Sequence, residues 1–205
     1  VMNDFCHGAS MKNATPPMRK GEKTRERLLA VSATLFAEKQ FHGTRISDIV
    51  KAAGVTQPSF YSYFQSKEEI YSLLIDKFDR ELEELVASML IDASLPKENV
   101  LENVSASFLR YLEFFHRNRE LTMISLFQQP QDRETRDKLK RWIARNMQIE
   151  QQRGFFSPDI PVEIMADCYL GVLLQTMLIA ADAKALKQIS EERGRFIYGG
   201  LTFRR

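Results

Sequence analysis

The chain is poor in the residues that mark disulfide-rich, loop-rich and membrane-embedded proteins. Among 205 residues it has two cysteines, Cys6 and Cys168, which form no disulfide or metal-binding spacing. Nine glycines and seven prolines are too few for a loop-rich all-β protein. The most apolar window, residues 168–181, is shorter than the roughly 20 apolar residues of a membrane-spanning helix. Residues 1–17 contain no apolar stretch of the kind found in secretory signals, so we expect a cytoplasmic protein.

The sequence also lacks the spacings that carry metal or covalent chemistry. The three histidines, His7, His42 and His116, are scattered and have no cysteine or carboxylate at ligand spacing, so we expect no metal site. There is no glycine-rich phosphate loop and no nucleophile elbow. We therefore expect no cofactor and no enzymatic activity.

The small net charge of +2 is distributed unevenly along the chain. Residues 1–66 hold nine Lys or Arg against five Asp or Glu, whereas residues 67–205 hold 20 against 22. The N-terminal third is therefore where an anionic partner would bind.

Apolar residues recur at spacings of three and four almost everywhere, and no strand pattern of any length is present. This periodicity predicts an all-α fold of about nine helices. We expect a flexible arm over residues 1–17, with Met2 and Met11 as possible native starts. A three-helix domain over residues 18–66 and a second helical domain over residues 67–205 would follow.

The most informative segment runs from Thr44 to Phe64. Thr44 is expected to cap a short helix, Gly54 to form a tight turn, and Thr56 to cap a second short helix with Pro58 in its first turn. These dimensions are typical of a helix-turn-helix, whose second helix enters the major groove of DNA.

The second short helix should have one buried and one exposed side. Phe60 and Phe64 are four residues apart and should pack inward, leaving the more exposed positions to Gln57, Ser59, Tyr61 and Tyr63. Gln can bond adenine, Ser can bond several base edges, and Tyr hydroxyls can reach phosphates. The alternative is ordinary packing, because short helices joined by a glycine turn occur in many bundles and aromatic runs are usually core.

Three strings carry a more specific resemblance: FHGTRISDIV over residues 41–50, AGV over residues 53–55 and SFYSYFQSKEEI over residues 59–70. Together they resemble the N-terminal domain of TetR-family transcriptional repressors, over roughly residues 19–74. The resemblance implies a dimeric one-component regulator with an N-terminal helix-turn-helix DNA-binding domain and a C-terminal ligand-binding and dimerisation domain.

Carried over position by position, the family pattern implies these DNA-binding residues: Thr44, Arg45, Ser47, Thr56, Gln57, Pro58, Ser59, Tyr61, Tyr63 and Lys67. Lys67 matches the usual phosphate-binding lysine, and Tyr63 stands where many members carry His. Gln57-Pro58 replaces the commoner Lys/Arg-Gly pair. This departure removes a positive charge and implies a different operator preference.

Beyond about residue 80 only the number and order of helices fit the family. The helix expected over residues 162–181 is apolar nearly all round, so both of its sides must be covered. With the last helix, expected over residues 186–203, it would form a four-helix dimer interface, which is also what the family uses, and Gly171 would permit close approach. The alternative is a buried central helix in a monomer.

The middle helices carry many aromatic and methionine side chains that could line an apolar ligand cavity: Phe78, Phe108, Tyr111, Phe115, Met123, Phe127, Trp142, Met147, Met165 and Tyr169. Ordinary core packing is the alternative for each of them. Possible polar anchors are Arg110, Glu113, His116 and Gln128.

These patterns lead to one functional expectation: a TetR-like repressor that binds a palindromic operator as a homodimer and is released by an apolar small molecule. An activator of the same fold is an alternative. A second alternative is a helical small-molecule-binding protein or enzyme whose DNA-binding domain is vestigial.

Overall fold

The computed structural model describes residues 20–179 and 183–203, so the arm expected over residues 1–17 lies outside the described residues. The described residues form nine α-helices, one short 3-10 turn and no strand, which confirms the predicted all-α fold. The elements are α1 (Lys20–Gly43), α2 (Ile46–Ala53), α3 (Gln57–Tyr61), α4 (Lys67–Ala87), η1 (Lys97–Asn99), α5 (Val100–Arg117), α6 (Arg119–Leu126), α7 (Asp132–Gln152), α8 (Val162–Met177) and α9 (Ala183–Thr202). No helix within the described ranges has the length and apolar character needed to cross a membrane.

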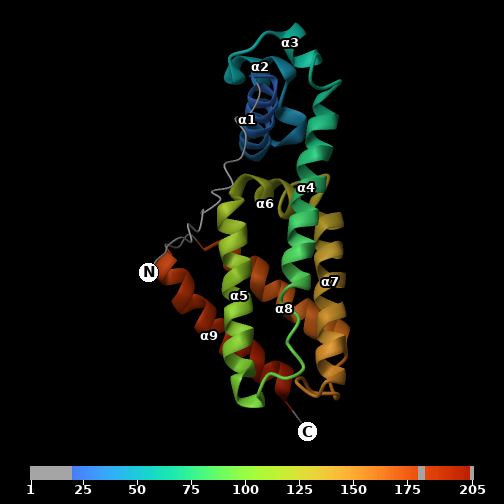
Figure 1. Ribbon diagram of the computed structural model, residues 1–205, viewed down its shortest axis with the longest axis vertical. Helices are drawn as coiled ribbons and strands as arrows, with labels where there is room; N and C mark the ends of the chain where they lie inside the picture. Colours follow the sequence, from blue (N-terminus) through green and yellow to red (C-terminus); the bar gives the residue numbers. More distant parts are fainter. Residues whose placement is uncertain (1–19, 180–182, 204–205) are drawn as a thin grey trace, which may run out of the picture.

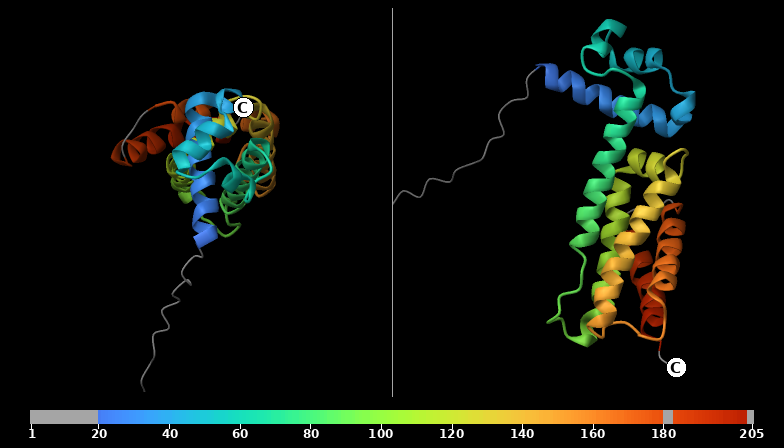
Figure 2. Two further views of the ribbon diagram at one scale, coloured as in Figure 1. Left: turned by 90° about the horizontal axis from the view of Figure 1, so that it is seen from above. Right: turned by 90° about the vertical axis from the view of Figure 1, so that its right-hand side faces the viewer.

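The molecule is elongated, with a small head of α1–α3 at one end and a body of α5–α9 at the other (Figure 1). Helix α4 begins in the head and extends far down the body, as the side view in Figure 2 shows. Helix α6 lies across the top of the body, where it packs beneath α1. The head is therefore joined to the body by α4 and also by the contact between α1 and α6.

Two hydrophobic cores correspond to the head and the body. The head core gathers α1–α3 around Phe36, Phe60 and Phe64, and it also takes in the start of α4 as far as Ile75 and Ile124 from α6. The body core begins at Phe78 on α4 and continues through α5 to α9. The packing thus continues across the boundary expected at residue 66, because the first half of α4 fills the head.

Polar contacts hold α4 against α7. The buried carboxylate of Asp79 on α4 lies 2.7 Å from Lys138 Nζ and accepts a hydrogen bond of 3.2 Å from the Thr135 hydroxyl, both on α7. Further along, the Asn146 amide on α7 donates to the Val86 carbonyl at 2.7 Å. These contacts fix the second half of α4 to α7.

Helix α9 crosses α5 at a point where the backbones approach closely. A Cβ atom placed on Gly194 would lie only 2.8 Å from Ser105 Cα, so glycine is required for this crossing. The Arg193 guanidinium also donates to the Thr176 hydroxyl of α8 at 2.7 Å. Helix α9 is thereby fixed against both α5 and α8.

One residue within α1 departs from helical geometry. Gln40 has φ 64° and ψ 165°, a combination that is essentially confined to glycine, and it separates the long part of α1 from a last short turn. The Gln40 carbonyl accepts a hydrogen bond of 2.9 Å from Thr44, and its side chain is exposed. The backbone conformation is therefore held by the surrounding fold and not by the glutamine side chain.

We predict that Gln40→Gly stabilises the protein by about 1 kcal/mol, because glycine adopts this conformation without the cost paid by a residue with a Cβ atom. Urea unfolding at a fixed protein concentration measures the change. Gln40→Ala is the matched control, since it removes the amide but keeps the Cβ, and it should bring no comparable gain. A glycine variant no more stable than the alanine variant would contradict the prediction.

Candidate nucleic-acid interface and ligand cavity

The short helix α3 is built as the sequence predicts. The Thr56 side chain caps it by accepting a hydrogen bond from the Ser59 amide at 3.4 Å, and Pro58 lies in its first turn. Phe60 is fully buried, and Phe64, just past the helix, is 1% exposed. These contacts fix α3 rigidly on the head core and determine which side chains point outward.

The expected outer face is only partly exposed. Gln57 and Pro58 are exposed and Tyr61 is 52% exposed, whereas Ser59 and Tyr63 are half-buried. The Tyr63 hydroxyl packs close to Gly21 of α1, where an added Cβ would lie 3.7 Å from it. Gln57 and Tyr61 are therefore the most accessible polar side chains of α3. On the neighbouring α2 segment, Arg45 and Ser47 are also exposed.

Thr44 is a correction to the sequence prediction. The first helical residue of α2 is Ile46, so the capping position is Arg45 and not Thr44. Thr44 is fully buried, and its hydroxyl lies 2.9 Å from the Gln40 carbonyl and 3.2 Å from the Leu35 carbonyl. Its side chain closes the end of α1 and cannot reach DNA.

Lys67 is also engaged inside the protein. Its ammonium donates to the carbonyls of Phe41 and Thr44, both at 2.9 Å, and lies 4.4 Å from the centre of the Phe41 ring. Two of its three N–H groups thus connect the start of α4 to the junction between α1 and α2. The third N–H makes no hydrogen bond to a described residue.

The body contains a cavity of about 50 Å³ between α5, α7 and α8, which is also lined by the segment after α4, by Phe156 and by Leu201 of α9. Three of the ten side chains expected to line a ligand site do so, namely Tyr111, Met147 and Tyr169. The other seven do not line this cavity: Phe78, Phe108, Phe115 and Met165 are buried in the body core, and Met123, Phe127 and Trp142 are half-buried. Most of the large side chains in this list therefore fill the core and do not border the cavity.

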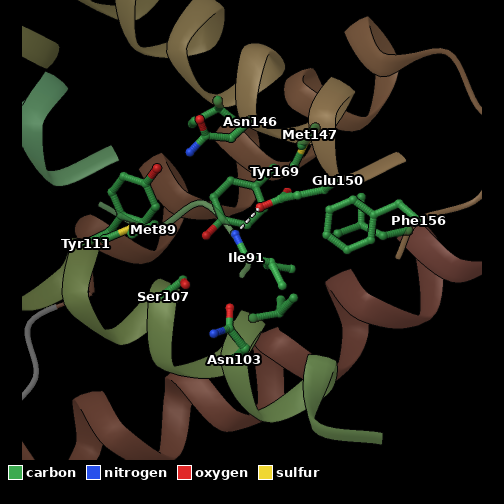
Figure 3. A pocket seen from close by; sticks show the side chains of 13 residues that line it. Met89, Ile91, Asn103, Ser107, Tyr111, Asn146, Met147, Glu150, Phe156 and Tyr169 are labelled. Atoms are coloured by element: carbon green, nitrogen blue, oxygen red, sulfur yellow. Dashed lines mark hydrogen bonds between the residues drawn. The ribbon is translucent and has the colours of Figure 1, made fainter. Parts of the chain in front are cut away.

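The cavity has a more polar lining than an apolar site would need. Figure 3 shows that Asn103, Ser107, Tyr111, Asn146, Glu150 and Tyr169 surround it, together with apolar side chains such as Met89 and Phe156. The anchors suggested by the sequence lie elsewhere. Arg110 bonds to Ser88, Gln128 bonds to the Ala37 carbonyl, and Glu113 and His116 are exposed on the outside of α5.

Glu150 is the residue that sequence reasoning missed. It is 6% exposed, and one carboxylate oxygen, Oε1, accepts a hydrogen bond of 3.1 Å from the Ile91 amide, just beyond α4. Burial raises the pKa of Glu150 to about 7, although the Ile91 bond and the nearby Arg153 guanidinium oppose this shift. The sequence did contain a signal for it. Glu150 shares one face of α7 with Leu139, Ile143 and Asn146, and all four residues are buried.

Within the described residues, no group of three or more His, Cys, Asp or Glu side chains is arranged to hold a metal ion. The polar side chains that line the cavity supply one carboxyl group, two phenols, two amides and one hydroxyl.

We predict that Glu150→Gln removes a pH-dependent cost to folding. Because the pKa of Glu150 rises from 4.5 to about 7 on folding, the native state holds a proton that the unfolded state has lost between those values. The free energy of unfolding of the unmodified protein should fall across this range, by up to about 3 kcal/mol. The other groups facing Glu150 are Tyr111 and Tyr169, whose pKa values burial raises so that they stay protonated in this range, and the Arg153 guanidinium.

Urea unfolding at pH 5 and pH 8 tests this expectation at one protein concentration. Glu150→Gln should gain stability relative to the unmodified protein on going from pH 5 to pH 8. Glu102→Gln, at an exposed position on α5, should show no such gain. Parallel pH profiles for all three proteins would contradict the burial of an ionising Glu150.

Comparison with known proteins agrees with this arrangement of head and body. A family model described as bacterial regulatory proteins, tetR family, matches residues 28–74. The chain is 34% identical over 185 residues to YdgC, an HTH-type transcriptional regulator of Bacillus subtilis (strain 168), covering 89% of this chain and 95% of that one. It is 30% identical over 161 residues to the HTH-type transcriptional repressor KstR2 of Mycobacterium tuberculosis (strain ATCC 25618 / H37Rv), covering 72% and 74%.

The solved structures agree on the fold. GusR of Salmonella enterica superposes with a TM-score of 0.69 at 19% identity, covering 90% of this chain and 97% of that one. The helix-turn-helix head, the helical body and the relationship to YdgC over nearly the whole length lead to one conclusion: the chain belongs to the TetR family of bacterial transcriptional regulators.

Proposed function

We propose that the protein is a repressor without catalytic activity that binds a palindromic DNA operator as a homodimer and releases it when a small molecule occupies the body cavity. The observation that carries the DNA-binding part is the outer face of α3, where Gln57 and Tyr61 are exposed beside a fully buried Phe60. The relatives with named roles are transcriptional regulators and repressors.

Gln57 and Tyr61 have different roles in this proposal. The Gln57 amide can donate to and accept from the edge of adenine, so it contributes to base selection. Tyr61 donates its hydroxyl to a phosphate and contributes affinity without sequence preference. The other residues expected to bind DNA, apart from the buried Thr44, contact the DNA backbone on either side of α3 in this proposal.

The proposed dimer uses the uncovered faces of α8 and α9. Exposed residues follow one helical stripe along α8 and its C-cap: Ile164, Cys168, Gly171, Gln175 and Leu178. Ile164 is 53% and Leu178 58% exposed, and Phe196 on α9 is 76% exposed. A Cβ placed on Gly171 would meet nothing within 4 Å, so a partner helix has room to approach. Apolar surface of this extent on two adjacent helices is typical of an interface.

The position of the cavity supports control by a ligand. Its volume of about 50 Å³ is well below the roughly 300–1,000 Å³ of sites for drug-sized molecules, so a larger ligand must displace a wall. The α7 wall is bonded to α4 through Asp79 and Val86. Displacement of α7 would therefore move α4 and, through the Lys67 contacts, the head.

Selection of random duplex DNA by the purified protein, followed by sequencing, tests the proposal. We expect a palindrome with two equal half-sites. Gln57→Ala should change the selected bases within each half-site, whereas Tyr61→Phe should keep the motif and weaken binding about fivefold, the loss of roughly one hydrogen bond. Tyr198→Phe, in α9, is the matched control and should change neither. No enriched sequence, or an unaltered motif with Gln57→Ala, would contradict the assignment.

The dimer gives a separate prediction. Phe196→Lys should weaken self-association at least 100-fold, because two-fold symmetry places the unpaired charge in the interface twice. Sedimentation velocity over a range of protein concentrations measures the effect. Leu73→Lys, at another partly exposed apolar position but on α4, should leave association unchanged. Equal association constants for the two variants would contradict an interface through α9.

A further inference from the structure

The described side chains that line the cavity in the body carry negative but no positive charge. Among the described residues that line it, Glu150 is the sole side chain with a formal charge, and none is Lys, Arg or His. Its other polar groups are the amides of Asn103 and Asn146, the hydroxyl of Ser107 and two phenols. An anionic ligand would meet a carboxylate here, with no cation among the described lining side chains to offset it.

Glu150 also has unused hydrogen-bonding capacity. Its Oε1 atom accepts from Ile91, but no described residue donates to Oε2, and the carboxylate forms no ion pair within the described part of the chain. The nearby Arg153 donates its NH1 group to the Ile91 carbonyl at 2.5 Å. A buried carboxylate without a direct ion pair is costly, and a ligand that brings a positive charge to it lowers that cost.

A second unpaired acceptor belongs to the same cavity. The Asn103 Oδ1 atom is buried and has no hydrogen-bond partner. In Figure 3 the Asn103 side chain projects from α5 on the side of the cavity opposite Glu150. Two acceptors without donors call for a ligand with several N–H groups, and a primary ammonium has three.

The rings of the cavity suit the same chemistry. Tyr111 and Tyr169 are 3% and 6% exposed, and their ring centres lie 6.0 Å apart in an edge-to-face arrangement. Aromatic faces attract cations, most strongly where water is excluded. The apolar side chains of Met89, Met147 and Phe156 can cover the body of a ligand whose charged end lies at Glu150.

We propose that this cavity binds a small organic cation, namely a protonated primary amine with a short apolar chain. Glu150 is the residue that interacts with its positive charge. The assignment rests on the proposed function only for the claim that such a ligand regulates DNA binding. Glu150 also holds the Ile91 amide just after α4 through Oε1, so a ligand bound at Oε2 of the same carboxylate contacts the group that fixes the end of that helix.

The test uses the full-length protein and n-alkylammonium ions of four to seven carbons. Each is compared with the alkanol and the alkanoate of the same chain length by isothermal titration calorimetry at pH 7.5 and constant ionic strength. We expect each ammonium to bind at least tenfold more tightly than the matched carboxylate. Glu150→Gln should weaken ammonium binding at least tenfold and leave alkanol binding unchanged, while Glu102→Gln should alter neither.

Equal affinity for ammonium and carboxylate, an ammonium affinity insensitive to Glu150→Gln, or no binding by any ammonium would overturn the assignment. Operator release is measured separately by fluorescence anisotropy on the selected DNA. An ammonium that binds through Glu150 without releasing DNA leaves the site assignment intact and contradicts the regulatory part of the proposed function. An alkanoate that binds and releases DNA contradicts the assignment of the cavity to cations and supports the regulatory part of the proposed function.

Discussion

Helix α4 has to satisfy two hydrophobic cores at once, because its first half packs into the head and its second half into the body. Most other features of the molecule follow from this constraint. Lys67 fixes the start of α4 to the end of α1, and Asp79 fixes its middle to α7. A change in the body that alters the direction of α4 must therefore also alter the orientation of α3. The coupling requires no flexible linker, since the continuous helix itself connects the two sites.

The body combines a well-packed core with one poorly satisfied polar cavity. Phe108 and Phe115 are completely buried, whereas beside the cavity the buried Asn103 Oδ1 has no hydrogen-bond partner among the described residues and the Glu150 carboxylate accepts from one described donor, the Ile91 amide. Groups of this kind reduce stability unless something binds them, so their presence is easier to understand in a protein that binds a ligand than in a purely structural bundle. The same reasoning applies to the exposed apolar stripe of α8, which is costly in water and favourable when a second copy covers it.

Local sequence signals predicted the fold well because most of them act over a few residues. The Thr56 cap, the turn at Gly54 and the inward faces of Phe60 and Phe64 all depend on nearby positions. Thr44 was misassigned because its hydroxyl bonds to carbonyls of α1, a contact that capping rules do not contain. The lining of the cavity was mostly missed, since bulky residues indicate where a core is filled and polar residues on a buried helix face indicate where it is not.

The shared packing has a consequence for modularity. The head core includes Ile75 of α4 and Ile124 of α6, so residues 18–66 alone would expose the apolar surface that these side chains cover. A segment cut at residue 66 would lack part of its own interior, so the head is not a self-contained packing unit of this structure. Transplanting the DNA specificity of this protein to another body would require α4 and α6 to move with the head, or a recipient whose helices reproduce their apolar faces.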